Sequence, residues 1–355
     1  MLDVNNPLTH NSASKARTDS KIILRNLGFK ELTININLKS KRKELFRGLN
    51  IIQKQLADYL NSIKPHSLLV VQYPWDILAF RFSKIIKKIT AAKSIKTILL
   101  IHDLNSLRNG DIFTKLYYNY FVQEYSFINM FDFVIAHNTS MKHYLISKGV
   151  SENKIYLLNV FDYLINDNNT LNREDPNFRR VLIAGNLSKH KAGYIYKLKK
   201  LTINNYSFIL YGNHVSKDLT DNSQTILYKG MVPADRLPSL LNNGFGLVWD
   251  GSSTQTCNGS FGKYLQFNNP YKFSLYLSSG IPVVVWSNSA IAGFVKENKL
   301  GLVISSLDEL DKIFNDLTVE DYHMYIKHVD VIKNKVINGW YLTNAINKIV
   351  KNIND

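Results

Sequence analysis

The chain has 355 residues, of which 45% are hydrophobic and 12% aromatic. This length exceeds one ordinary core and suits two domains of about 150 to 180 residues each, with disorder expected only in short loops. The single cysteine, Cys257, excludes an internal disulfide framework and a cysteine-cluster metal site, and it fits a reduced, cytoplasmic setting.

The charge is strongly positive, with 44 Lys and Arg against 28 Asp and Glu and a formal net charge of +16. Such a surface attracts nucleic acid, acidic lipid or nucleotide substrates, or simply keeps the protein soluble. The basic residues are spread along the whole chain, and no RRM, KH, zinc-finger or homeodomain signature occurs. We therefore expect no nucleic-acid partner.

Neither secretion nor membrane insertion is expected. The first residues contain no basic segment followed by an apolar stretch, so a signal peptide is not predicted. The apolar runs at 68–71, 98–101 and 281–286 are far shorter than the roughly 20 residues that span a bilayer.

Short β-rich runs alternate with amphipathic stretches in the first half of the chain, a pattern typical of parallel βαβ units. Only residues 1–4 precede the polar loop at 5–14, so the first strand is either very short or incomplete at its start. Further strands are predicted at 32–37, 67–72, 96–102, 131–137 and 154–159. Helices are predicted at 43–62, 75–90, 112–127 and 140–148.

A polar break at 166–176 separates this half from a second one in which the alternation restarts. Strands are predicted there at 180–185, 207–212, 225–230, 244–249, 281–286 and 300–304. The pattern indicates an α/β protein with two doubly wound, Rossmann-like domains facing across a cleft, at 1–165 and 166–338. The last helix, within 339–355, is a candidate to cross back onto the first domain.

Two neighbouring strands of the second half end in residues that suit ligand binding, because ligands of parallel sheets lie beyond the carboxyl ends of strands. One strand ends in Gly185-Asn186, where the backbone can approach a ligand closely, and Lys189 follows. The alternative is an ordinary turn with a basic face. The next strand ends in Tyr211-Gly212, and this ring either stacks on a base or packs in the core.

The stretch 249–272 is the most informative, because a strand end and a small-residue loop lead into Asn-Asn-Pro-Tyr-Lys at the start of a helix. Pro270 suits the first helical turn, and Asn269 is placed as the N-cap. A helix N-terminus with Lys272 one turn in suits a diphosphate, since the helix dipole and the ammonium both favour anions. A capped core helix is the alternative.

A candidate general base lies in the first half, where the strand at 96–102 ends in His102-Asp103. A base near neutrality is needed wherever a hydroxyl must lose its proton. Asp103 is the provisional base and His102 or Asp76 the helper. The alternative is a structural His-Asp pair.

Residues 249–277 carry a resemblance to a known family. They read Trp-Asp-Gly…Thr-Cys-x-Gly-x-Phe-Gly-x-Tyr-Leu-x-Phe-Asn-Asn-Pro-x-Lys-x-Ser-Leu-Tyr-Leu. This run resembles the β-1,6-galactofuranosyltransferases of bacterial O-antigen and capsule assembly, as do, in the same order, 15–17, 101–103, 161–164 and 184–191. More distantly, 244–249, 271–272 and 280–283 are similar to the glucosyltransferases that extend O-linked GlcNAc on serine-rich adhesins.

The resemblance implies a GT-B fold, a UDP-sugar donor, and no metal or cofactor. The sequence agrees, since it contains no Asp-x-Asp metal motif and no two Glu eight residues apart. The implied UDP contacts are the loop at 12–14 with Ser14, then Lys189, Tyr211, Gly212, Phe267, Asn268, Asn269, Pro270, Tyr271 and Lys272. The adhesin branch has arginine where this chain has Lys189, and a lysine offers a point charge instead of a fork. That branch also self-associates, so a homo-oligomer is consistent with the resemblance.

The leading hypothesis is transfer of galactofuranose from UDP-galactofuranose to a lipid-linked oligosaccharide at the cytoplasmic face, with inversion. The second domain would hold UDP, with Lys189 and Lys272 on the diphosphate, and the first would hold the acceptor. One alternative is a UDP-glucose-dependent glucosyltransferase that extends O-linked GlcNAc on an adhesin. Another is a non-catalytic GT-B assembly partner.

The predicted helix at 75–90 raises a separate question about membranes. Lys84, Lys87 and Lys88 fall on one face and apolar residues on the other. The helix either packs in the core with a solvated basic face or sets that face against anionic lipid, which would bring the protein to the inner face of the membrane.

Overall fold

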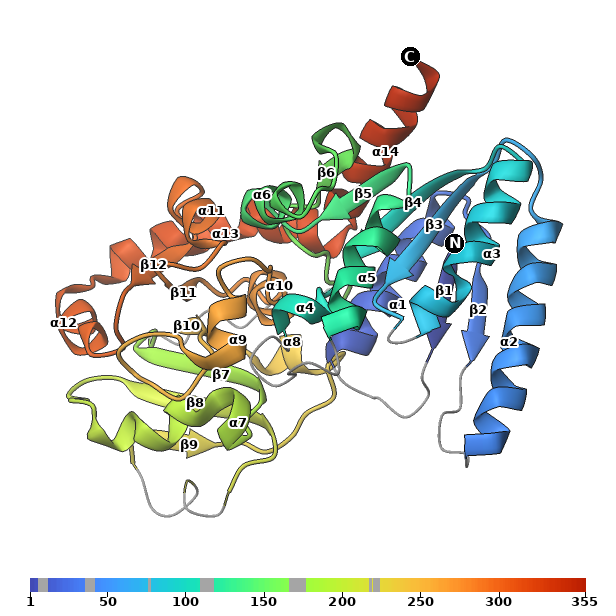
Figure 1. Ribbon diagram of the computed structural model, residues 1–355. Coiled ribbons are helices and arrows are strands. Elements are labelled where there is room, and N and C mark those ends of the chain that lie inside the picture. The colour runs from blue at the N-terminus through green and yellow to red at the C-terminus, as the bar shows by residue number, and fades with distance from the viewer. Residues whose placement is uncertain are drawn as a thin grey trace. The chain divides into compact units, whose positions relative to one another are not determined.

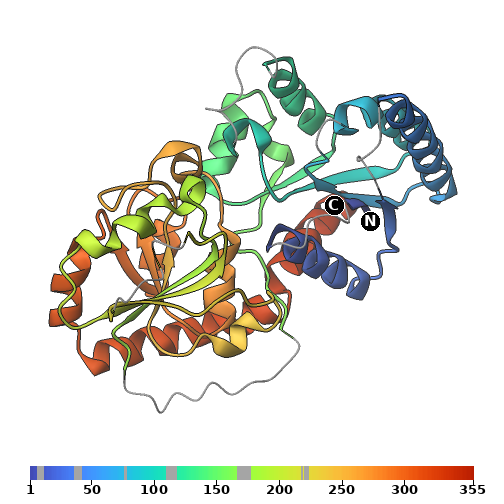
Figure 2. The same ribbon diagram turned by 90° about the horizontal axis from the view of Figure 1, so that it is seen from below.

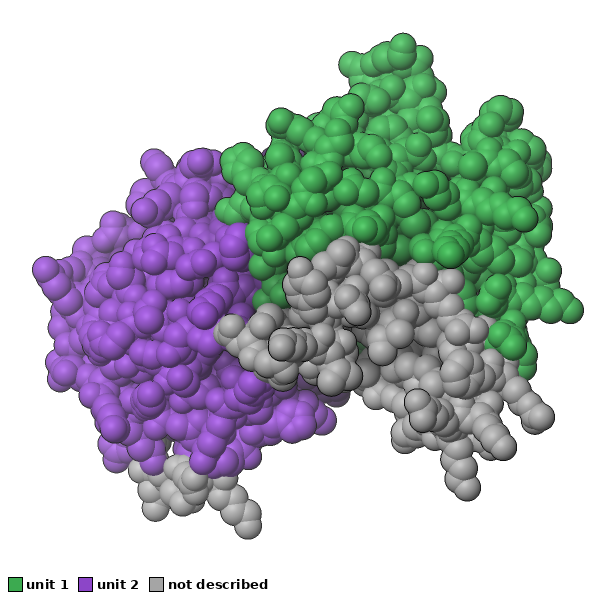
Figure 3. Space-filling view, in the orientation of Figure 1, with its two compact units in different colours: residues 1–158, 342–355 green, residues 159–341 purple. Residues whose placement is uncertain are grey.

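The computed structural model describes residues 1–5, 12–35, 42–75, 78–108, 118–165, 177–216, 219 and 224–355. The chain forms two compact units (Figure 3). Unit 1 contains Met1–Leu158 and Leu342–Asp355, and unit 2 contains Asn159–Tyr341. The polar segment expected as a linker, 166–176, lies outside the described residues.

Unit 1 is built on a six-stranded parallel sheet with the strand order β2-β1-β3-β4-β5-β6 (Figure 1). Its strands are β1 Leu2–Asn5, β2 Leu32–Asn35, β3 Leu68–Tyr73, β4 Lys96–Ile101, β5 Phe133–Ala136 and β6 Ile155–Leu157. Its helices are α1 Ser12–Asn26, α2 Arg42–Ser62, α3 Leu78–Ala92, α4 Asn105–Arg108, α5 Tyr118–Asn129, α6 Thr139–Ser147 and η1 Glu152–Lys154. The first strand, β1, pairs with both β2 and β3.

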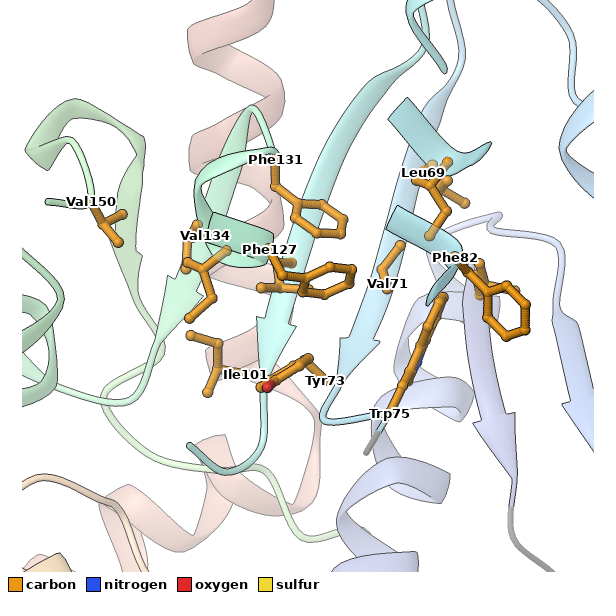
Figure 4. Packing of buried hydrophobic residues seen from close by; sticks show 14 of the residues in the cluster. Leu69, Val71, Tyr73, Trp75, Phe82, Ile101, Phe127, Phe131, Val134 and Val150 are labelled. Carbon is orange, nitrogen blue, oxygen red and sulfur yellow. The ribbon is translucent and has the colours of Figure 1, made fainter. Parts of the chain in front are cut away.

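The two faces of the β3 strand are both buried. Leu69, Val71 and Tyr73 belong to a core cluster that also contains Phe82 of α3 and Phe127 of α5 (Figure 4). The residues between them are buried outside this cluster. Helices therefore cover both faces of the sheet, as a doubly wound fold requires (Figure 1 and Figure 2).

Helix α3 uses its apolar face for this core. Phe82 and Ile86 are buried in the cluster, and Lys84, Lys87 and Lys88 are exposed on the helix. From Phe82 onward, where its side chains are described, the apolar side of α3 therefore packs inside unit 1 and its basic side faces solvent.

Unit 2 has a second six-stranded parallel sheet, with the strand order β12-β11-β10-β7-β8-β9. Its strands are β7 Arg180–Asn186, β8 Ser207–Asn213, β9 Ile226–Tyr228, β10 Phe245–Val248, β11 Val283–Trp286 and β12 Gly301–Ile304. Its helices are α7 Lys189–Ala192, η2 Gly193–Lys200, α8 Leu237–Leu240, α9 Gly259–Tyr264, α10 Tyr271–Ser278, α11 Ala292–Glu297, α12 Glu309–Asp316 and α13 Val319–Ile337. The predicted fold class is confirmed.

Helix α10 is fixed to this sheet by Tyr276, whose side chain is fully buried. The tyrosine hydroxyl accepts a hydrogen bond from Ala184 N at 2.9 Å and donates to Leu182 O at 3.1 Å. The ring lies directly against β10 because Gly246 has no side chain there, and a Cβ at this position would overlap the ring. The helix that carries Lys272 is thereby held in register with β7.

The chain passes into unit 2 after Leu158, ahead of the expected boundary at residue 165. The reason is a set of hydrogen bonds within unit 2. Tyr163 N donates to Val336 O at 3.1 Å, and the Tyr163 hydroxyl donates to Ala234 O at 2.7 Å. The last helix, α14 Trp340–Asn354, begins at the end of unit 2, and its residues from Leu342 onward belong to unit 1.

Candidate active site

The strands β7 and β8 each have a glycine near the carboxyl end, so no side chain covers the backbone there. Gly185 and Gly212 are direct partners in the parallel pairing of these strands. Gly212 has φ +157°, and a Cβ there would collide with Gly185 O, so a side chain is excluded. A Cβ at Gly185 would meet no described atom within 4 Å, which leaves its backbone open to a ligand. Asn186 is exposed, and its side-chain oxygen accepts from Ser188 N at 2.9 Å.

The basic residues after β7 lie over aromatic rings. Lys189 is exposed, and its Nζ lies 5.2 Å from the centroid of the Tyr196 ring. That ring is fixed in turn, because the Tyr196 hydroxyl donates to Leu187 O at 3.1 Å. A cation held over a ring keeps its charge while losing mobility. Lys189 is therefore positioned beyond the carboxyl end of β7, where its ammonium can meet an anion.

Tyr211 lies in β8 opposite Ala184 of β7 and is half-buried. Partial burial raises the pKa of its hydroxyl above 10.0, so the ring is neutral at physiological pH. Both uses expected for this residue, packing and stacking, are compatible with a ring that is only partly covered.

The start of α10 differs from the expectation in one respect. Asn269 is not the N-cap, because the cap residue is Pro270, with φ −65° and ψ 133°. The Asn269 side chain is instead buried and donates from Nδ2 to Asn159 O at 2.7 Å. The carbonyl of Pro270 accepts from Phe273 N at 2.9 Å, as the cap residue of a helix should.

The predicted UDP-binding residues near Asn269 differ from one another in burial and in the contacts that they make. Phe267 is half-buried, and the side-chain oxygen of Asn268 is buried with no hydrogen-bond partner among the described residues. The ring of Tyr271 stacks on Tyr163, with centroids 4.9 Å apart and planes 25° apart. Tyr271 thus joins the helix to the segment that follows Leu158, in addition to any ligand contact.

Lys272 occupies the second position of α10 and already has partners. Its Nζ lies 2.8 Å from Asp250 Oδ1 and donates to Trp249 O at 3.0 Å. The sequence interpretation missed Asp250, although an acidic residue directly after a strand is the same signal that singled out Asp103. The structure therefore brings Lys272 to the carboxyl end of β10 as half of an ion pair.

In unit 1, His102 is buried at the end of β4. Its Nε2 lies 2.7 Å from Gln72 Oε1, and its backbone N–H donates to Tyr73 O at 2.9 Å. Burial, followed by electrostatic interaction with Arg17 and His137, holds the pKa of His102 well below 6.5. The low pKa keeps the imidazole neutral, and its contact with Gln72 ties the ring to β3.

Asp103 is the accessible member of the pair, with 21% of its side chain exposed. Its Oδ2 accepts from Arg108 Nη1 at 2.8 Å, and Arg108 is the last residue of the single-turn helix α4. The geometry thus presents a carboxylate at the carboxyl end of β4. Asp76, the other candidate helper, lies outside the described residues.

Ser14 lies in the first turns of α1, so the expected loop at 12–14 is helical. Arg17, one turn further on, donates to Asp3 within β1 and to Pro74 O, directly after β3. Asp3 also pairs with Lys21 at 3.1 Å. These contacts fix the start of α1 beside the strand ends of unit 1.

The described residues contain no group of three or more His, Cys, Asp and Glu that could hold a metal ion. None of their helices combines the length and the apolar character needed to cross a membrane.

The two parallel-sheet, Rossmann-like units define the fold class of the protein as GT-B. Solved structures with this fold cover nearly the whole chain. One is Alr3699/HepE from Anabaena in complex with UDP-glucose, with a TM-score of 0.60 and 12% identity over 99% of this chain and 98% of that one. Another is the lipopolysaccharide outer core galactosyltransferase WaaB, with a TM-score of 0.60 and 12% identity over 99% of both chains.

The chain belongs to the glucosyltransferase 3-like family, whose N-terminal domain matches residues 2–160 and whose C-terminal domain matches residues 181–349. It is 32% identical over 306 residues to the β-1,6-galactofuranosyltransferase WbbI of Escherichia coli K12, covering 84% of both chains. It is 28% identical over 321 residues to glucosyltransferase 3 of Streptococcus gordonii, covering 88% of this chain and 86% of that one.

Proposed function

We propose that this protein transfers galactofuranose from UDP-galactofuranose to a sugar hydroxyl of a lipid-linked oligosaccharide, with inversion and without a metal or other cofactor. The observation that carries the choice of donor is the 32% identity with a β-1,6-galactofuranosyltransferase over 84% of both chains. The site residues are compatible with this donor, since its diphosphate needs cations and exposed backbone.

In this proposal unit 2 holds the donor. The diphosphate approaches the open backbone at Gly185 and binds Lys189 and Lys272. Because Lys272 is paired with Asp250 in the structure, the phosphate oxygens take the place of that carboxylate when the donor binds. The N-terminus of α10 adds the favourable end of its dipole, and the half-buried Tyr211 ring is available for the uracil base.

Unit 1 supplies the base. The Asp103 carboxylate removes the proton from the acceptor hydroxyl. At the same time the oxygen of that hydroxyl attacks the anomeric carbon of the donor sugar. The bond from that carbon to the diphosphate breaks in the same displacement, and UDP leaves with the electron pair. A single displacement inverts the anomeric configuration. The two lysines stabilise the charge that develops on the leaving diphosphate.

A donor screen tests the proposal. The purified protein would be offered UDP-galactofuranose and UDP-glucose with a lipid-linked acceptor and with an O-GlcNAc-bearing adhesin peptide, followed by linkage analysis of each product. We expect transfer only from UDP-galactofuranose to the lipid-linked acceptor. Transfer of glucose to the peptide would instead favour the second candidate, an adhesin glucosyltransferase. The family match and the 28% identical relative, both named glucosyltransferases, support the glucose donor of this candidate. No transfer and no UDP release with either donor would indicate a non-catalytic assembly partner.

The proposed place of action is the cytoplasmic face of the membrane, where a lipid-linked acceptor would be found. Lys84, Lys87 and Lys88 form an exposed basic face on α3, and such a face is attracted to anionic lipid. We also propose that several copies of the chain associate, which light scattering of the purified protein would measure.

A further inference from the structure

Glu124 of α5 is a carboxylate enclosed inside unit 1. Its side chain is fully buried, yet it accepts three hydrogen bonds. Oε1 accepts from the Tyr73 hydroxyl at 2.7 Å and from Asn105 N at 3.0 Å, and Oε2 accepts from Ser106 N at 3.0 Å. A buried carboxylate is tolerated when both oxygens have donors, and bonds to an ionised acceptor are among the strongest in proteins.

These bonds fix the segment that carries Asp103. Asn105 and Ser106 are the first two residues of α4, and Arg108, which pairs with Asp103, is its last. The backbone oxygen of Tyr73 accepts from His102 N at 2.9 Å, so Tyr73 and Glu124 together hold the chain on both sides of Asp103.

We propose that Glu124 is a positioning residue that sets the orientation of the Asp103 carboxylate through α4 and Arg108. The inference rests on the proposed function, in which Asp103 is the general base. A base must lie within hydrogen-bonding reach of the proton that it removes, and a misplacement of about 1 Å can cost a hundredfold in rate. Because Glu124 is fully buried, in this proposal it acts through α4 and not by contact with the substrate.

Glu124→Gln tests this with little change in shape. The amide keeps one acceptor oxygen but points an NH₂ group at a backbone N–H, so one of the bonds to α4 is lost. We expect kcat to fall about 10- to 100-fold, with the donor KM and the UDP affinity within about twofold of the wild-type values. Glu152→Gln is the matched control, because Glu152 is an exposed carboxylate of the same unit paired with Lys142. It should leave kcat unchanged.

A double variant separates positioning from general destabilisation. If Glu124 acts through Asp103, adding Glu124→Gln to Asp103→Asn should lower kcat no further, because coupled residues are not additive. A further 10- to 100-fold loss in that background would overturn the proposal. An active Asp103→Asn variant would instead refute the base assignment, and an inactive Asp103→Asn beside a fully active Glu124→Gln would refute only the role of Glu124.

Tyr73→Phe provides a second route if Glu124→Gln fails to fold. It removes one donor to Glu124 and keeps the backbone bond to His102 and the ring contact with Phe127, whose centroid is 5.6 Å away. We expect a folded protein with reduced kcat and unchanged UDP affinity. A folded Tyr73→Phe protein with wild-type kcat would overturn the proposal.

Discussion

Lys272 Nζ lies 2.8 Å from Asp250 Oδ1, and both side chains are largely buried, with 15% and 8% of their areas exposed. The pair joins the second residue of α10 to the end of β10. Lys272 therefore has two tasks in the proposed mechanism, because it neutralises Asp250 before the donor binds and the diphosphate afterwards.

Lys272→Ala should affect UDP binding and stability separately. We expect UDP affinity to weaken by about 1.5 to 3 kcal/mol, the range for a hydrogen bond to a charged group, as measured by calorimetry. The melting temperature should also fall, since Asp250 loses its cation. Adding Asp250→Asn should restore the melting temperature without restoring UDP affinity, and Lys296→Ala, on the exposed surface of α11, should change neither. Unchanged UDP affinity would place the diphosphate elsewhere.

Asp103→Asn should reduce kcat by about 10² to 10⁴, the usual contribution of a positioned general base. UDP affinity should stay near the wild-type value, because the nucleotide is proposed to bind unit 2. Steady-state kinetics and calorimetry check the two halves of this prediction, with Asp58→Asn on the exposed side of α2 as the control. A variant that keeps more than about a tenth of kcat would be incompatible with this base.

Stability should depend on pH through buried histidines. Burial lowers the pKa of His137 to about 4, although Asp103 and nearby backbone carbonyls oppose the shift. Below pH 6.5 His137 is therefore protonated in the unfolded chain but stays neutral in the folded one. The free energy of unfolding consequently falls as pH drops from 6.5 towards 4. The slope approaches about 1.4 kcal/mol per pH unit for each such histidine, and His102 adds a second one.

Urea unfolding between pH 7.5 and 5 measures this slope above the range in which most carboxylates titrate. His137→Gln keeps a donor for Ile101 O, to which His137 Nε2 is hydrogen-bonded at 3.1 Å. This variant should lower the slope of the free energy of unfolding against pH by the contribution of one histidine. His323→Gln, on an exposed position of α13, should leave the slope unchanged. A wild-type stability that is flat across this range would contradict the assignment.

Transfer should continue in excess EDTA. The sequence contains no Asp-x-Asp motif, and the proposal gives the charge of the leaving diphosphate to Lys189 and Lys272. The assay would compare initial rates before and after chelation, with a metal-dependent transferase treated in parallel. Loss of activity that Mn²⁺ or Mg²⁺ restores would rule out the cation-based mechanism proposed for unit 2.

Binding to anionic vesicles should be purely electrostatic, because the apolar face of α3 is occupied by Phe82 and Ile86 in the core. Sedimentation with acidic liposomes should weaken as salt rises past physiological strength. Each lysine near the surface contributes about 1 kcal/mol, so changing Lys84, Lys87 and Lys88 to Glu should abolish binding. The same change at the exposed Lys296, Lys312 and Lys327 of unit 2 is the control. Equal binding to neutral liposomes would contradict a membrane role for the basic face of α3, whose function would then be packing in the core of unit 1.

The sequence predicted the fold closely because a parallel sheet buried on both faces leaves a strong signal. Every predicted strand with described residues is present, from β2 at Leu32–Asn35 to β12 at Gly301–Ile304. The short α4 was missed, since its four residues have no periodicity of their own and are held by Glu124, a residue nineteen positions away. The boundary after Leu158 depends on similar long-range bonds, such as that from Tyr163 N to Val336 O.

The site was less predictable than the fold because its contacts, like those that hold α4, join residues far apart in the sequence. Glycines at strand ends and a lysine at a helix start are visible in a sequence, so Gly185, Gly212 and Lys272 could be proposed. Which partner a polar side chain chooses is a matter of tertiary geometry. Asn269 was therefore wrongly predicted to be the N-cap, because its side-chain amide donates to Asn159 O instead. For the same reason, Asp250 was not predicted as the partner of Lys272.

The assignment of Leu342–Asp355 to unit 1 has a consequence for the order of events during protein synthesis. Unit 2 is one uninterrupted stretch of chain, whereas unit 1 is interrupted by it. The buried side chains of Leu342, Ala345, Ile346 and Ile349 therefore leave the ribosome after unit 2. Domains generally fold as units as they emerge. Synthesis of unit 1 therefore begins before that of unit 2, but its folding is completed only after unit 2 has been made. A nascent chain must keep the incomplete unit 1 from aggregating while the whole of unit 2 is translated.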